Sequence, residues 1–251
     1  MIGPASARRR SVAGLTRRAL LMSAGTMTAV TGVLRPSRAK AFPEDTDSLR
    51  WLAFYGVNAD ESVLASYDVV VLDSGFQGSV RRIARTGARV CGYISLGEIR
   101  TSDPALAFLD DAALLPPNPD WPGTRRVDVR RPSWRSLILD RQIPALVAQG
   151  FTGLMLDTLD TPPYLELLDP ARYHGMREAA VALVHSIRAL WPKMTLVLNR
   201  GYALLPDVLQ TIDAVVAESL LTFPDPATGG GVHGSIPGKS KRSWRCCLRR
   251  G

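Results

Sequence analysis

The chain has 251 residues, of which 46% are hydrophobic, so it can bury one large core; its formal net charge is +8. The basic excess is confined to the ends, because eight basic residues precede Phe42, six follow Ala227, and neither segment contains an acid. Residues 42–226 carry 17 basic and 23 acidic residues, a net charge of −6. This acidic body argues against nucleic-acid binding and favours a cationic ligand.

The cysteines and histidines are too few and too scattered for a disulfide framework or a zinc site. Cys91 lies in a predicted strand, and Cys246 and Cys247 are adjacent in the tail. Three histidines are spread between positions 174 and 233 without metal-ligand spacing. We therefore expect a protein that works without a metal or cofactor.

Residues 1–41 have the composition of an export signal. Arginines precede an uncharged run at 19–34, and the small-x-small sequence AKA at 39–41 provides a cleavage site before Phe42. The sequence TRRALL at 16–21 is typical of a twin-arginine signal, which exports folded proteins in bacteria. The prediction is a periplasmic or extracellular protein with no stable membrane span after cleavage.

Residues 42–226 alternate between apolar segments typical of buried strands and segments with helical periodicity. The predicted strands cover 51–56, 67–73, 89–98, 154–157, 194–201 and 213–219. The predicted helices cover 60–66, 78–86, 133–149, 173–191 and 204–209. We expect loops at 161–170 and, in a Pro-rich segment above the catalytic face, at 103–132. The alternation predicts an α/β fold, a TIM-type (β/α)8 barrel truncated after six units, since closure needs eight strands.

The composition changes abruptly near residue 227. Residues 227–251 have no apolar periodicity and a basic bias. Two interpretations stay open: a disordered tail, or a frameshift or premature stop that has replaced the last two strand and helix units.

Five predicted strands end on a carboxylate or an amide. These residues are Asp73, Glu98, Asp157, Asn199 and Glu218. Active sites of (β/α) barrels are built at the C-terminal ends of the strands. We therefore expect these five side chains to form one constellation.

Four blocks in order carry a family resemblance: GYISLGE, GFTGLMLDTLDT, LVLNRG and AVVAES. Together they resemble the spherulin-4-like family of endo-α-1,4-polygalactosaminidases, which includes hydrolase domains acting on the Pel polysaccharide. The resemblance covers about residues 51–223 and implies a (β/α)8 barrel that cleaves partly deacetylated N-acetylgalactosamine polymers. Such polymers are cationic, in agreement with the acidic body. The last quarter of such a barrel has no counterpart here.

Glycoside hydrolysis needs two carboxyl groups, and we assign Asp157 and Glu218. Both end predicted strands, so both face the same end of the barrel, and the resemblance points to the same positions. Asp157 is assigned as nucleophile and Glu218 as general acid/base, because the apolar residues before Glu218 would raise its pKa. This assignment favours retention of configuration. The alternatives are a capping role for Asp157 and a structural ion pair for Glu218.

The other candidate residues are expected to bind substrate. Asn199 would hydrogen-bond a sugar, unless it is an ordinary turn residue. Glu98 and Asp73 would bind ammonium groups, unless they pair with Arg81 or Arg100. Asp160 would support the site.

Aromatic side chains could stack on sugar faces. Tyr93 and Tyr202 are the main candidates, followed by Tyr164 and Trp121. Arg200 would repel an amino sugar, so we expect it to pair with Asp157, Asp160 or Glu218.

Two other function classes remain open. One is a secreted, non-catalytic or degenerate carbohydrate-binding protein that lost activity through C-terminal truncation. The other is a phosphodiester-cleaving barrel, which is disfavoured because the chain lacks the histidine pair or metal cluster that this chemistry uses.

Overall fold

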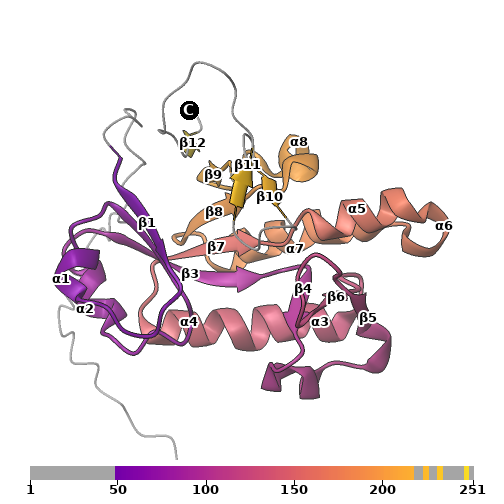
Figure 1. Ribbon diagram of the computed structural model, residues 1–251, viewed down its shortest axis with the longest axis horizontal. Coiled ribbons are helices and arrows are strands. Elements are labelled where there is room, and N and C mark those ends of the chain that lie inside the picture. The colour runs from indigo at the N-terminus through magenta and orange to yellow at the C-terminus, as the bar shows by residue number, and fades with distance from the viewer. Residues whose placement is uncertain (1–48, 218–222, 226–230, 234–245, 249–251) are drawn as a thin grey trace, which may run out of the picture. The chain divides into compact units, whose positions relative to one another are not determined.

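The computed structural model describes residues 49–217, 223–225, 231–233 and 246–248 (Figure 1). The predicted export signal and Glu218 lie outside these residues. All of the described residues belong to one compact unit, residues 38–251. Within them, no helix is long and apolar enough to cross a membrane.

The centre of the fold is a sheet of six parallel strands. In spatial order they are β1 (Trp51–Phe54), β2 (Val69–Leu72), β3 (Arg89–Ser95), β7 (Gly153–Asp157), β8 (Thr195–Asn199) and β9 (Ala214–Val216). Each pairs with the next in parallel register. Helices lie between the strands along the chain, which confirms the predicted α/β fold of a TIM-type barrel with six units.

The sheet is buried on both faces, as parallel sheets usually are. Alternate residues pack into two separate apolar clusters because successive side chains of a strand point to opposite faces. One cluster packs against the helices and includes Val70, Leu72, Val90, Leu154, Leu156, Leu196 and Leu198. The other contains Val69, Val71, Cys91, Met155, Val197, Ala214 and Val216. This second cluster lies on the inner face of the six-stranded sheet. Side chains at the strand ends that keep the same alternation point to this inner face.

The helices follow the predicted order with shifted ends. They are α1 (Glu61–Leu64), α2 (Val80–Ala84), α3 (Pro132–Ser136), α4 (Ile143–Gln149), α5 (Thr161–Leu168), α6 (Pro170–Tyr173), α7 (Met176–Leu190) and α8 (Leu205–Val208). A 3-10 turn, Tyr202–Leu204, precedes α8.

A π-helical stretch, Leu137–Gln142, joins α3 to α4, so the predicted helix 133–149 is continuous. Pro144 follows this stretch and cannot donate an i→i−4 hydrogen bond, and the wider π turn accommodates that loss. Gly150 ends α4 in the left-handed conformation, with φ of 104°.

Both predicted loops were wrong in part. Residues 161–168 form α5, because Pro162 and Pro163 occupy its first turn, where backbone N–H groups have no intrahelical acceptor. The segment 103–132 contains two 3-10 turns (Pro104–Phe108 and Asp111–Ala113) and two strands, β5 (Leu114–Pro117) and β6 (Thr124–Val127). The prolines of β5 are tolerated because β5 is an edge strand in the small sheet β4-β6-β5.

The predicted strand 89–98 is also divided. β3 ends at Ser95, and Glu98 begins β4 (Glu98–Arg100), which pairs with β6 (Figure 1). Gly97 lies in the turn between them, where a Cβ atom would stand 2.4 Å from the Thr158 carbonyl oxygen. Glu98 is therefore not at the tip of a strand of the central sheet, contrary to the prediction.

The described residues of the tail form short strands. β10 (Phe223–Asp225) pairs with β11 (Gly231–His233), and β12 (Cys246–Leu248) pairs antiparallel with β9. The rest of 227–251 lies outside the described residues, so the interpretations of this segment stay predictions.

Gly153 allows β7 to lie close to its neighbours. A Cβ atom there would be 2.7 Å from the Thr195 carbonyl oxygen and 2.6 Å from Cys91 Sγ. We expect Gly153→Ala to lower the free energy of unfolding by about 3 kcal/mol in a urea titration. The control is Gly92→Ala, whose Cβ would meet mainly the flexible end of Leu146 and should cost about 1 kcal/mol. Equal losses of unfolding free energy in the two variants would contradict the explanation that close backbone packing requires glycine at position 153.

Glu166 on α5 caps the N-terminus of α7. Its carboxylate accepts hydrogen bonds from Arg177 N at 2.9 Å and Gly175 N at 3.0 Å, and these bonds lower its pKa. A lowered pKa means that the stabilisation is present above the unfolded-state pKa of about 4.3 and is lost as the pH falls through the folded-state value.

We expect Glu166→Gln to cost about 1 kcal/mol of unfolding free energy at pH 7, as for other helix caps. At pH 3 the wild type and the variant should differ less. A difference that is the same at both pH values would show that the charge of Glu166 contributes nothing.

Candidate active site

Asp157, the last residue of β7, is held from both sides by the neighbouring strands. Tyr93 on β3 donates its hydroxyl to Asp157 Oδ2 at 2.7 Å, and Asn199 on β8 donates Nδ2 to Asp157 Oδ1 at 2.8 Å. Each of the three lies two positions after a residue of the inner apolar cluster, namely Met155, Cys91 and Val197. Residues two positions apart on a strand point to the same face, so Asp157, Tyr93 and Asn199 also lie on the inner face, at the C-terminal edge of the sheet. The structure thus brings three of the predicted site residues together.

The donors to Asp157 are both neutral. Burial, and next the negative charge of Asp157, raise the pKa of the Tyr93 phenol above its ordinary value, so the hydroxyl stays protonated and donates. None of the ion pairs within residues 49–217 involves Asp157. The carboxylate is therefore oriented by hydrogen bonds while keeping its negative charge available to a substrate.

Thr158, directly after Asp157, anchors the turn that ends β3. Its hydroxyl accepts hydrogen bonds from Gly97 N at 2.8 Å and Leu96 N at 3.1 Å. Thr158 has φ of 61°, an uncommon value for a β-branched residue, and Arg200 after Asn199 has φ of 55°. Such backbone strain is concentrated at functional sites. Here it occurs directly after the two polar residues that end β7 and β8.

Asp160 connects the loops after β7 and β8. It pairs with Arg200 Nε at 2.9 Å and accepts a hydrogen bond from Gly201 N at 3.1 Å. The expectation that Arg200 pairs with an acid of the site is confirmed for Asp160. Asp160 therefore fixes the turn after Asn199. Tyr202, at the start of the next 3-10 turn, is partly exposed.

Glu98 is embedded in the protein. It is only 6% exposed and accepts hydrogen bonds from Thr161 Oγ1 at 2.7 Å, Asn118 Nδ2 at 2.8 Å and Thr124 Oγ1 at 3.0 Å. These bonds join β4 to the β5–β6 connection, β6 and α5. Such a position gives Glu98 a structural role and does not favour the predicted contact with a substrate ammonium group.

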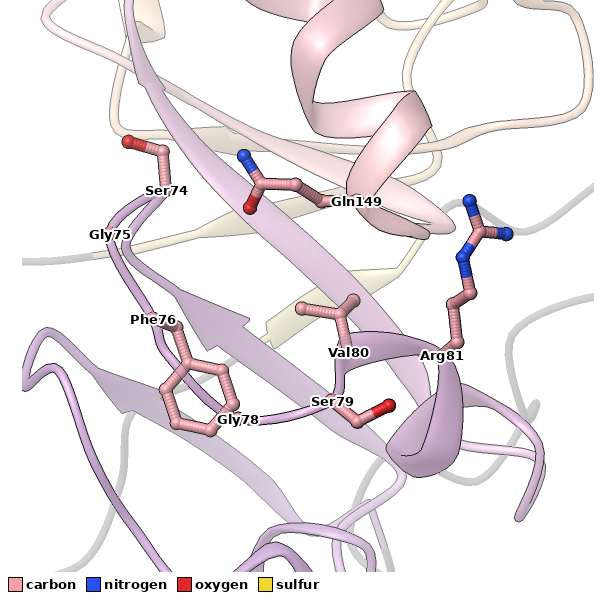
Figure 2. A pocket seen from close by; sticks show the side chains of 8 residues that line it. All are labelled: Ser74, Gly75, Phe76, Gly78, Ser79, Val80, Arg81 and Gln149. Atoms are coloured by element: carbon pink, nitrogen blue, oxygen red, sulfur yellow. The ribbon is translucent and has the colours of Figure 1, made fainter.

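Asp73 lies after β2 and is tied to the local backbone. It accepts a hydrogen bond from Gly75 N at 2.8 Å, and Arg100 Nη2 lies 3.9 Å from its Oδ2. Arg100 is one of the two arginines, with Arg81, that were left open as alternative partners of Asp73. A pocket of about 440 Å³ follows in this loop (Figure 2), and it is lined by Ser74, Gly75, Phe76, Gly78, Ser79, Val80, Arg81 and Gln149. None of the predicted site residues lines it.

Sequence reasoning missed two residues of the site. Tyr55, next to the C-terminal end of β1, contacts the Tyr93 ring edge to face at 5.5 Å between centroids, and it is 55% exposed. Tyr55 lies inside the predicted strand 51–56, and its position next to a strand end was the available signal. The anchoring role of Thr158 had no signal in the sequence, because it depends on Leu96 and Gly97.

Comparisons with known proteins define the class. Residues 34–229 match Glycoside-hydrolase family GH114, and the chain belongs to this family. It is a glycoside hydrolase, in agreement with the family that the sequence blocks indicated. The comparison with curated protein sequences gave no match.

Two solved structures relate the fold to particular proteins. The glycoside hydrolase domain of PelA from Pseudomonas aeruginosa has 27% identity and a TM-score of 0.62, over 74% of this chain and 73% of that chain. Ega3 from Aspergillus fumigatus, solved in complex with galactosamine, has 19% identity and a TM-score of 0.56, over 70% and 69%. The second likeness shows the shared fold.

The Thr158 hydroxyl can be tested without touching Asp157. Thr158→Val keeps the shape but leaves Gly97 N without its acceptor, whereas Leu96 N still donates to the Asp157 carbonyl oxygen at 3.0 Å. We therefore expect a loss of about 1–3 kcal/mol in unfolding free energy. Thr158→Ser keeps the hydroxyl and serves as the control. If the two variants are equally stable in thermal and urea unfolding, the hydroxyl is not an anchor.

Proposed function

We propose that this glycoside hydrolase cleaves internal α-1,4 linkages in a partly deacetylated N-acetylgalactosamine polymer. The observation that carries the proposal is the Asp157 carboxylate, oriented by Tyr93 and Asn199 at the C-terminal edge of the sheet in a chain of family GH114. The galactosamine bound to Ega3, which shares this fold, supports an amino-sugar substrate. The net charge of −6 over residues 42–226 suits a cationic polymer.

Asp157 and Glu218 are the proposed catalytic pair. Asp157 attacks the anomeric carbon while Glu218 protonates the departing glycosidic oxygen, which gives a glycosyl-enzyme ester and a shortened chain. Glu218 then removes a proton from water, the water attacks the anomeric carbon, and Asp157 leaves as carboxylate with overall retention. Val216, two residues before Glu218, pairs in register with Asn199, so β9 ends beside the residue that holds Asp157.

The proposed domain organisation follows from the same function. Residues 1–41 would direct export through a twin-arginine route to the periplasm or the exterior, where an exopolysaccharide is accessible. We assign residues 42–226 to the hydrolase domain and residues 227–251 to a basic tail, of which β12 pairs with β9. Asn199 and Tyr202 would contact the sugar beside Asp157.

The alternative is a carbohydrate-binding protein without turnover. It is favoured by the six parallel strands of the described residues, where a complete barrel has eight. The two candidates differ in whether the carboxyl groups are needed for a reaction or only for binding.

Asp157→Asn and Glu218→Gln should each lower the release of reducing ends from partly deacetylated α-1,4-galactosaminogalactan by at least about 100-fold. Both variants should still sediment with the polymer. The matched control is Asp111→Asn, an exposed acid in the second 3-10 turn of the 103–132 segment. Release that is absent even from the wild type, with binding intact, would support the non-catalytic alternative.

A further inference from the structure

We propose that Arg126 on β6 and Tyr164 on α5 form a subsite that recognises an N-acetylated sugar unit of the polymer. The inference rests on the proposed function and adds a specificity to it. The enzyme would cleave where an acetylated unit occupies this subsite, so the acetylation pattern of the polymer would determine the positions of cleavage.

The two side chains face each other where α5 packs on the small sheet. The guanidinium carbon of Arg126 lies 5.2 Å from the centroid of the Tyr164 ring. Arg126 is directly opposite Glu98 in the β4–β6 register, so their side chains lie on the same face. Glu98 bonds Thr161, one helical turn before Tyr164, and thus the same two elements make both contacts.

This pair lies next to the catalytic edge of the central sheet. Val127 N, one residue after Arg126, donates to the Gly97 carbonyl at 2.9 Å, and Gly97 N bonds Thr158 Oγ1, the residue after Asp157. On the other side, Tyr164 N donates to the Asp160 carbonyl at 3.1 Å. β6 is therefore hydrogen-bonded to the turn after β3, and α5 follows the turn after Asp157. We place a sugar beyond the cleaved one at the Arg126–Tyr164 pair.

Most N–H groups of the Arg126 guanidinium donate no hydrogen bond within the described residues. Its side chain makes one long hydrogen bond, from Nη2 to Asn118 Oδ1 at 3.3 Å. No carboxylate within the described residues pairs with it, because the nearest candidate across the sheet, Glu98, accepts from three neutral donors. Nε is buried without a hydrogen-bond partner in the described part of the chain. A half-buried cation of this kind suits a ligand that brings an acceptor oxygen.

An acetamido group matches these features and a free amine does not. Its carbonyl oxygen can accept from the guanidinium, whereas an ammonium group would be repelled by it. The Tyr164 ring, 49% exposed, offers an apolar face to the acetyl methyl and the sugar C–H groups. The subsite therefore selects the acetylated unit by attraction and rejects the deacetylated unit by charge.

The test compares two substrates: partly acetylated and fully deacetylated α-1,4-galactosamine polymers of equal length. With the full chain, kcat/KM is measured on both for the wild type, Arg126→Ala, Arg126→Lys and Tyr164→Leu. Arg135→Ala, an exposed arginine on α3, is the matched control. Thermal unfolding of each variant establishes that it is folded, and mass spectrometry of the products locates acetyl groups relative to the new ends.

We expect Arg126→Ala to lose about tenfold in kcat/KM on the partly acetylated polymer and to gain on the fully deacetylated one, since a repulsive charge is removed. Arg126→Lys should keep the low kcat/KM on the deacetylated polymer, because the positive charge remains. Its kcat/KM on the acetylated polymer should fall, because an ammonium group lacks the planar, two-pronged donor geometry of a guanidinium. Tyr164→Leu should have a lower kcat/KM on the partly acetylated polymer, and its products should show a less regular acetylation pattern.

Three results would overturn the proposal. Equal losses of Arg126→Ala on both polymers would show a purely structural role. An unchanged ratio between the polymers in folded Arg126 variants would show that Arg126 does not contact the substrate, while the proposed function stands. No cleavage or binding of either polymer by the wild type would overturn the proposed function itself, and this subsite with it.

Discussion

The arrangement of the site depends on one constraint, the in-register pairing of β3, β7 and β8. Parallel pairing places Tyr93, Asp157 and Asn199 on the same face of the sheet, where two neutral donors hold one carboxylate. A shift of one residue in either strand pair would turn a donor to the helix-covered face. The buried residues that determine the register, such as Gly153, are therefore as necessary for the site as the polar residues themselves.

The turns after β7 and β8 carry backbone strain. Thr158 and Arg200 adopt positive φ, and each is held by contacts from another loop: Thr158 by the 95–97 turn and Arg200 by Asp160. The small β4-β6-β5 sheet follows the 95–97 turn and is hydrogen-bonded to it through Val127 N and the Gly97 carbonyl. Because of this connection, the segment 98–127 belongs to the site even though none of its residues contacts Asp157 through a hydrogen bond within the described residues.

The two ends of the central sheet differ within the described residues. β1 is the last strand at one end of the sheet order within the described residues, so one edge of it faces no described strand. At the other end, β9 pairs with β12 from the basic tail in antiparallel fashion. In a closed (β/α)8 barrel the first and last strands pair with each other and no edge is left.

The sequence by itself determined the six strands, their order, the carboxylate at the end of β7 and the family. These follow from local apolar runs and from motifs, which need no tertiary information. Only the tertiary structure decided that 161–168 is a helix and that Glu98 is a buried structural acid. Prolines in a first helical turn look like breakers in sequence, and a buried carboxylate looks like an exposed one until its partners are known. The same holds for Thr158, Arg126 and Tyr164, whose partners come from elements distant in the chain.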